Sequence, residues 1–147
     1  MNLIVFIGLQ ASGKSSFFRE RFFRTHVRIN LDMLRTRYRE WFLFAACLEG
    51  KTNTVVDNSN LTRADRARYI APARMARFRI QGYFFESCVT DALVRNAARP
   101  DEERVPDLAI RGGARKLEFP SRTEGFDDLY YVRLNGNFVV EDWRDEL

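Results

Sequence analysis

A glycine-rich segment near the start of the chain carries the residues best suited to phosphate chemistry. Residues 8–15 read GLQASGKS, which matches the pattern Gly-x-x-x-x-Gly-Lys-Ser in full. Gly8 and Gly13 let the backbone turn so that successive N–H groups converge on an anion. Lys14 is placed to reach the β- and γ-phosphates of a nucleotide, and the Ser15 hydroxyl to ligate Mg²⁺. The pattern predicts a nucleotide-binding loop; a glycine turn formed by chance is the alternative. The expected nucleotide contacts within it are Gly8, Ala11, Ser12, Gly13, Lys14, Ser15 and Ser16.

A carboxylate and an arginine follow at helical spacing. Asp32 and Arg35 stand three residues apart, which places them on one face of a helix turn. A carboxylate there can accept the proton of an attacking hydroxyl, and an arginine can hold a phosphate of the acceptor. The alternative is structural, with Asp32 capping a helix and Arg35 in solvent.

A second acidic residue ends an apolar stretch. Asp57 follows Val55 and Val56, a position at which acidic residues help organise nucleotide-bound Mg²⁺. Asn58 and Asn60 come directly after it. They either add polar contacts or build the turn, and the sequence does not choose between these roles.

Two further arginines precede an acidic stretch. Arg95 and Arg99 are spaced i, i+4 on an expected helix, and Pro100, Asp101, Glu102 and Glu103 follow. This segment could be a lid that brings arginine onto a transferring phosphoryl group. The alternative is a solvated helix face paired with those acids.

These residues must be positioned by alternating strands and helices. Apolar, β-branched or aromatic runs predict strands at 3–7, 27–29, 54–57, 78–86, 126–134 and 138–140, the last two forming a hairpin across 135–137. Helices are expected at 14–23, 32–48, 62–75, 91–98 and 106–117, with a capping box at Thr62 and Asp65. The alternation predicts an α/β layered fold with a mainly parallel sheet. We expect residues 1–147 to form a single domain.

The composition suits a folded domain, and its arginine content is explained mostly by genomic bias toward arginine. Of the 147 residues, 46% are hydrophobic, and 24 Lys and Arg stand against 20 Asp and Glu. Only Lys14, Lys51 and Lys116 are lysines, so arginine, which grips phosphate bidentately, supplies nearly all the positive charge. That surplus permits a nucleic-acid partner without requiring one.

The remaining special residues predict no metal or redox site. Cys47 and Cys88 lie in apolar runs and are expected to be buried in a reducing compartment. His26 has no Cys or His companion and is expected in a loop or at a strand edge. The longest uncharged apolar stretch, 41–48, is too short to span a membrane. We therefore expect no membrane association and a cytoplasmic location.

In combination, four segments resemble the phage-type polynucleotide 5′-kinase family, P-loop kinases that are also related to zeta-toxin-like kinases. They are residues 8–15, LDMLR at 31–35, VVDNSNL at 55–61, and RNAAR at 95–99 leading to Val105-Pro106. They occur in the family's order and span most of the chain, from Ile4 to Pro106. The first segment is common to many NTPases, whereas the Asp-x-x-Arg and Arg-Asn-x-x-Arg segments are more specific in combination.

The resemblance implies a P-loop kinase three-layer fold, with sheet order 2-3-1-4-5 and a small helical lid at about 91–106. It implies transfer of the γ-phosphoryl group of ATP, with Mg²⁺, to the 5′-OH end of DNA or RNA. Lys14 and Ser15 would bind the nucleotide phosphates and Mg²⁺, and Asp57 would help organise the metal's water shell.

The same resemblance assigns the acceptor and lid residues. Asp32 resembles the general base on the 5′-OH, and Arg35 the clamp on the acceptor's neighbouring phosphate. Arg99 would be the lid arginine over the donor phosphates, with Arg95 also a candidate.

Two features depart from the family's pattern. The lid is acidic at Asp101, Glu102 and Glu103, where a basic lid would suit a long nucleic acid. No phosphatase, ligase or phosphodiesterase segment accompanies the kinase motifs, so we expect the chain to act alone or with a separate repair protein. Residues 119–147 carry no assigned chemistry, and Phe126 and Tyr130 fit a core equally well.

Two other functions stay open. One is a P-loop kinase of a small hydroxyl acceptor such as a nucleoside, sugar nucleotide or antibiotic, which the acidic lid favours. The other is a nucleotide-dependent switch, which requires a water-positioning residue and ordered switch loops that the sequence does not identify.

Overall fold

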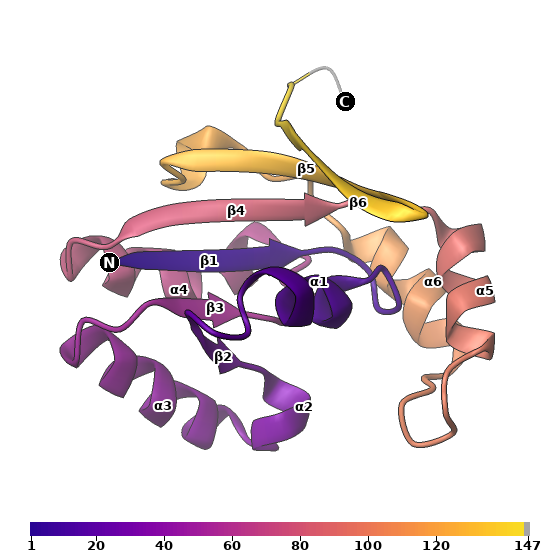
Figure 1. The fold of residues 1–147 in the computed structure, drawn as a ribbon, viewed down its shortest axis with the longest axis horizontal. Helices are drawn as coiled ribbons and strands as arrows, with labels where there is room; N and C mark the ends of the chain where they lie inside the picture. Colours follow the sequence, from indigo (N-terminus) through magenta and orange to yellow (C-terminus); the bar gives the residue numbers. More distant parts are fainter. Residues whose placement is uncertain (146–147) are drawn as a thin grey trace.

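Strands and helices alternate along most of the chain and stack in layers around one sheet (Figure 1). The computed structural model describes residues 1–145. The strands are β1 (Asn2–Ile7), β2 (Val27–Ile29), β3 (Thr54–Val56), β4 (Arg79–Phe85), β5 (Asp128–Asn135) and β6 (Asn137–Asp142). The helices are α1 (Lys14–Arg21), α2 (Leu31–Leu34), α3 (Arg37–Glu49), α4 (Arg63–Met75), α5 (Val89–Ala97) and α6 (Asp107–Lys116), with a 3₁₀ turn at Arg122–Glu124.

The first five strands of the sheet have the predicted order, and the second strand of the predicted hairpin extends the sheet by one. Its strands run β2-β3-β1-β4-β5-β6, so the expected order 2-3-1-4-5 is confirmed. The first five are parallel, and β6 pairs antiparallel with β5 across the predicted hairpin. Gly136 supplies the positive φ of 77° at that turn. The α/β class is therefore confirmed.

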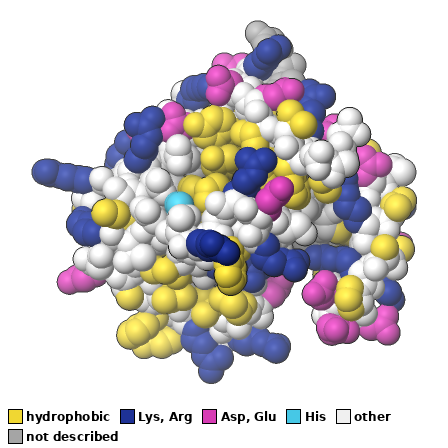
Figure 2. Space-filling view, in the orientation of Figure 1, with side chains coloured by type: hydrophobic (Ala, Val, Ile, Leu, Met, Phe, Trp, Pro, Cys, Tyr) yellow, Lys and Arg dark blue, Asp and Glu magenta, His cyan; other side chains and the backbone are white. Residues whose placement is uncertain are grey.

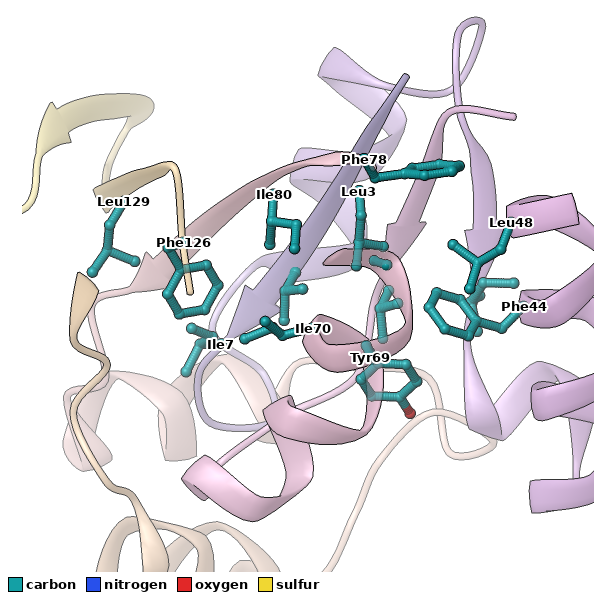
Figure 3. Close-up of a cluster of buried hydrophobic side chains, with 14 of the residues drawn as sticks. Leu3, Ile7, Phe44, Leu48, Tyr69, Ile70, Phe78, Ile80, Phe126 and Leu129 are labelled. Carbon is teal, nitrogen blue, oxygen red and sulfur yellow. The ribbon is translucent and has the colours of Figure 1, made fainter. Parts of the chain in front are cut away.

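The central strand β1 is buried on both faces because its side chains alternate between two cores. Leu3, Val5 and Ile7 belong to the larger cluster, which is completed by α3 and α4 (Figure 3). Ile4 and Phe6 belong to the opposite cluster, in which α1 contributes Phe17 and Phe18 and β6 adds Phe138. The loop after Ile7 is thus fixed by a strand with no exposed face.

The predicted helix at 32–48 is wrong as a single element. Arg35 adopts a φ of 78°, outside the helical region, and ends α2 after one turn. Thr36 then caps α3, its side chain accepting a hydrogen bond from the Arg39 N–H. The apolar periodicity continues across the break, which is why it suggested one helix. The first helix is also shorter than expected, ending at Arg21.

The capping box at Thr62 and Asp65 is confirmed at the start of α4. Cys47 is buried as expected, but Cys88 is exposed because it precedes α5 at the surface. His26 lies in the turn before β2, where its ring contacts Thr25 and Asn2. Across residues 1–145, no helix combines the length and apolar character needed to cross a bilayer.

Candidate active site

The phosphate loop has the backbone that its glycines predict. Gly13 precedes α1 with a φ of 97°, and a Cβ there would lie 3.2 Å from the Phe138 ring. A Cβ on Gly8 would lie 3.1 Å from both the Phe85 Cβ and the Ser12 Oγ. Neither position has room for a side chain without displacement. Ala11 also adopts a left-handed conformation, with a φ of 62°.

Lys14 curls back over this loop. Its Nζ donates to the carbonyls of Gly8 (3.0 Å) and Leu9 (2.5 Å) and to the Ser12 Oγ (3.3 Å). Burial lowers the pKa of Lys14 to about 8, although Asp57 opposes that shift. The ammonium group is held where phosphate oxygens could take the place of the loop's carbonyls.

The proposed metal ligands are in contact at the end of β3. The Ser15 Oγ donates to the Asp57 Oδ2 over 3.0 Å. A hydroxyl and a carboxylate are hard oxygen donors that fit Mg²⁺. No cluster of three or more His, Cys, Asp and Glu residues occurs in the described chain, so a cation here would depend on nucleotide phosphates and water for its other ligands.

Arg28 is a member of this site that the sequence reasoning missed. Its Nε donates to the Asp57 Oδ2 (2.8 Å), and its Nη2 donates to the Ser15 Oγ (3.0 Å). It lies on β2, whose register places it beside Val55 on β3, two residues before Asp57. That register is the signal that could have identified it.

Asp32 and Arg35 line the same cleft as the phosphate loop, but they do not share a helix face, because Arg35 leaves the helical conformation at the end of α2. The helix cap is Asn30, whose side chain accepts from the Met33 N–H, so the role of cap for Asp32 is wrong. Asn30 also donates to the Asp57 carbonyl over 2.6 Å. The short helix that carries Asp32 is thereby attached to the residue proposed to organise the metal.

The two asparagines after Asp57 have structural contacts. Asn58 accepts from the Leu31 N–H (2.9 Å) and donates to the Glu40 Oε2 (2.7 Å). Asn60 adopts a φ of 48° and donates to the Phe6 carbonyl. Turn chemistry therefore accounts for Asn60, while Asn58 connects the site to α2 and α3.

A buried carboxylate, also missed from sequence, supports this wall of the site. Glu40 on α3 is 2% exposed and accepts from the Tyr69 hydroxyl over 2.8 Å. Arg37 also donates to it over 2.9 Å. Burial and the Glu40 carboxylate raise the pKa of Tyr69 to about 12, so its hydroxyl remains a donor.

The predicted lid lies on the side of the phosphate loop away from α2 and α3 (Figure 1). Arg95 on α5 donates to the Ala11 carbonyl over 3.2 Å. Asn96 is 1% exposed and joins both ends of the segment, donating to the Val105 carbonyl (2.7 Å) and accepting from its N–H (3.1 Å). Arg99 follows the end of α5 and lines the cleft.

The acids of the lid do not pair with Arg95 or Arg99 in the described structure. Asp101 forms its ion pair with Arg104, at 2.8 Å. Glu102 and Glu103 line the cleft instead. The interpretation of this segment as a helix face neutralised by its own acids is therefore wrong for Arg95 and Arg99.

One open cleft of about 1640 Å³ collects most of the predicted site. Figure 2 shows the hollow between the body of the molecule and the arm carrying residues 98–106, with dark blue basic side chains along it. Gly8 and Ser12, two residues of the loop itself, are buried and do not line the cleft. The predicted residues that line it are Ala11, Gly13, Lys14, Ser15, Ser16, Asp32, Arg35, Asp57, Arg95 and Arg99.

Comparison with known proteins agrees with this geometry. A curated relative, the bifunctional polynucleotide phosphatase/kinase of Schizosaccharomyces pombe, is 24% identical over 97% of the chain, which spans about a third (35%) of that protein. Among solved structures, a gluconokinase from Sinorhizobium meliloti 1021 superposes with a TM-score of 0.64 at 21% identity, covering 90% of this chain and 82% of that one. Kti12 of Chaetomium thermophilum, in complex with ADP-AlF3, gives 0.67 at 20% identity, covering 90% and 89%. No protein-family model matches the chain.

These likenesses define the class: the chain has the P-loop kinase fold. The curated relative confirms the resemblance to polynucleotide kinases that the motifs suggested.

Proposed function

We propose that the chain transfers the γ-phosphoryl group of ATP to the 5′-OH end of a nucleic acid. The observation that carries this proposal is that Asp32 and Arg35 line the same cleft as the phosphate loop. A carboxylate and an arginine in one cleft suit a hydroxyl whose neighbour is a phosphate. The open cleft, of about 1640 Å³, is larger than the roughly 300–1,000 Å³ of pockets for one small ligand.

The reaction is an in-line displacement. The 5′-oxygen attacks the γ-phosphorus, the bond from that phosphorus to the β,γ-bridging oxygen breaks, and ADP leaves. The Asp32 carboxylate takes the hydroxyl proton. Lys14 and Arg99 hold the donor phosphates as their charge redistributes, and Arg35 holds the acceptor's phosphate. Ser15 and Asp57 would hold Mg²⁺, which supplies charge neutralisation on the phosphates when bound.

The test is transfer of γ-labelled phosphate to a short single-stranded oligonucleotide with a 5′-OH, beside one blocked by a 5′-phosphate. We expect label only on the 5′-OH strand. Asp32→Asn should lower kcat by about 10²- to 10⁴-fold, the usual contribution of a general base, and leave ATP binding intact. Full activity in this variant would remove Asp32 as the base.

A small-molecule acceptor is the second candidate, favoured by the acidic rim. Glu102 and Glu103 line the cleft, where they would repel a long polyanion. The structural neighbour from S. meliloti is named as a gluconokinase. Transfer to nucleosides or sugar alcohols, with none to oligonucleotides, would support this candidate. Glu102→Gln/Glu103→Gln separates the two, because it should aid an oligonucleotide acceptor and not a neutral one.

A further inference from the structure

The α2–α3 segment exposes a group of large apolar side chains. Tyr38, Trp41 and Phe42 on α3 are 75%, 47% and 66% exposed, and Met33 on α2 is 52% exposed. The Tyr38 and Phe42 rings lie one helical turn apart, with centroids separated by 6.2 Å. Figure 2 shows hydrophobic side chains gathered over the region where Figure 1 places α3. Single exposed apolar residues are ordinary, but a contiguous group marks a binding surface.

The charge of this aromatic face is one-sided. Arg35, Arg37 and Arg39 are interleaved with the aromatic residues and are exposed. The single acidic residue among positions 33–46 is Glu40, which is buried and bonded to Tyr69. The face therefore presents arginine and aromatic rings to solvent without a carboxylate between them. Exposed aromatic rings with arginines are the combination that binds single-stranded nucleic acid, by stacking on bases and pairing with phosphates.

The aromatic face is continuous with the active-site cleft. Asp32 and Met33 on α2, Arg35 at its end and Arg37 at the start of α3 all line the cleft. From there α3 runs away from the phosphate loop (Figure 1). A strand whose first nucleotide lies at Asp32 and Arg35 would thus reach α3 with its following nucleotides.

We propose that the aromatic face binds the unpaired bases that follow the 5′-terminal nucleotide of the acceptor. This inference rests on the proposed function and specifies its substrate as single-stranded ends, because a base within a duplex has no free face for Tyr38 or Phe42. It also leads the strand away from the acidic lid, because α2 and α3 lie on the other side of the molecule from α5 and the loop that follows it (Figure 1).

The experiment compares acceptors of different length. A nucleoside 3′-phosphate with a free 5′-OH reaches only the cleft, whereas a twelve-nucleotide single strand also reaches α3. We expect Tyr38→Ala/Phe42→Ala to raise the KM of the twelve-mer by about tenfold or more. The KM and kcat for the nucleoside 3′-phosphate, and the KM for ATP, should stay unchanged. Met75→Ala, at an 86% exposed site at the end of α4, is the control and should change none of these values.

Trp41 gives a readout that does not depend on turnover. The twelve-mer should quench tryptophan fluorescence in the unaltered protein and much less in Trp41→Phe, in which Trp143 is the remaining indole. If quenching is lost in Trp41→Phe but no 5′-OH acceptor is phosphorylated, the proposed activity is refuted, whereas the assignment of the aromatic face as a binding surface is supported.

Three results would overturn the inference while leaving the activity intact. The first is equal KM values for the short and long acceptors. The second is a twelve-mer KM that is unchanged in the double variant. The third is self-association of the chain, measured by light scattering, that the double variant abolishes while its oligonucleotide binding stays unchanged. This face would then be a protein interface.

Discussion

At the residue scale, the charge of the Lys14 side chain depends on its burial in the phosphate loop. It lies over the loop's own carbonyls, and burial lowers its pKa from 10.5 to about 8. A nucleotide needs the charged form, since the attraction is between ammonium and phosphate. Below pH 8 that form is already present. Above pH 8 the free protein has lost the proton, so binding must take one up and becomes weaker.

We therefore expect the Kd for ATP to be nearly constant from pH 7 to 8 and to rise by up to about tenfold per pH unit above 8. Calorimetry in two buffers of different ionisation enthalpy should show proton uptake over the same range. Lys116→Arg, on the exposed surface of α6, is the control and should give the same profile. A Kd that stays flat to pH 9.5 would contradict the assignment to Lys14.

Arg28 and a divalent cation would compete for the same oxygens. Arg28 bonds both Asp57 and Ser15, the two protein groups that fit Mg²⁺. We expect Arg28→Gln to lower the Mg²⁺ concentration for half-maximal transfer by about fivefold, equivalent to ~1 kcal/mol. Arg133→Gln, which removes an exposed guanidinium, should leave that requirement unchanged. A higher requirement in Arg28→Gln would mean that Arg28 supports the site.

At the element scale, the sequence predicts what local patterns encode. The strand before Gly8 follows from its apolar run, whereas the sheet order was implied by the resemblance to a known family. Parallel strands bring Asp32, Asp57 and the phosphate loop to one edge. The break after α2 was missed because Arg35 is not a residue type that announces a positive φ. Glu40 was missed for a different reason. Its partner Tyr69 lies 29 residues away, and only the packed helices bring the two together.

Hydrogen bonds between Asn96 and Val105 join the two ends of the lid segment. Asn96 makes both of its hydrogen bonds with Val105, so the residues between them form a loop anchored at one point. We expect Asn96→Ala to cost about 1–3 kcal/mol locally, because two backbone groups lose their partner. The freed loop should be cut faster by trypsin after Arg104, since Arg99 precedes Pro100 and resists the enzyme, and kcat should fall more than the affinity for ATP. Thr90→Ala, exposed on the same helix, is the control; equal cleavage of the two variants would show that another contact anchors the lid.

At the scale of the whole molecule, one buried ion pair joins the kinase motifs to the late strands. Arg66 on α4 is fully buried, and its Nε and Nη2 donate to the two oxygens of Glu124, at 2.8 and 3.1 Å. Its Nη1 donates to the carbonyls of Asn60 and Leu61. The 3₁₀ turn that holds Glu124 leads into Phe126 in the core and then into β5. Residues 119–145, part of the stretch 119–147 to which the sequence assigned no chemistry, therefore complete the core and hold the turn after β3; residues 146–147 lie outside the described residues.

Glu124→Gln tests this connection. The amide keeps the shape of the carboxylate but removes the charge opposite a guanidinium that has no access to water. Breaking one partner of a buried pair costs about 3–5 kcal/mol, so the free energy of unfolding in urea should fall by that amount. Glu141→Gln removes an exposed pair with Arg133 at 3.8 Å and should cost less than about 1 kcal/mol. If the two variants lose equal stability, Arg66 is held by the carbonyls of the turn alone, and the late strands are attached to the sheet by their hydrogen bonds and apolar contacts.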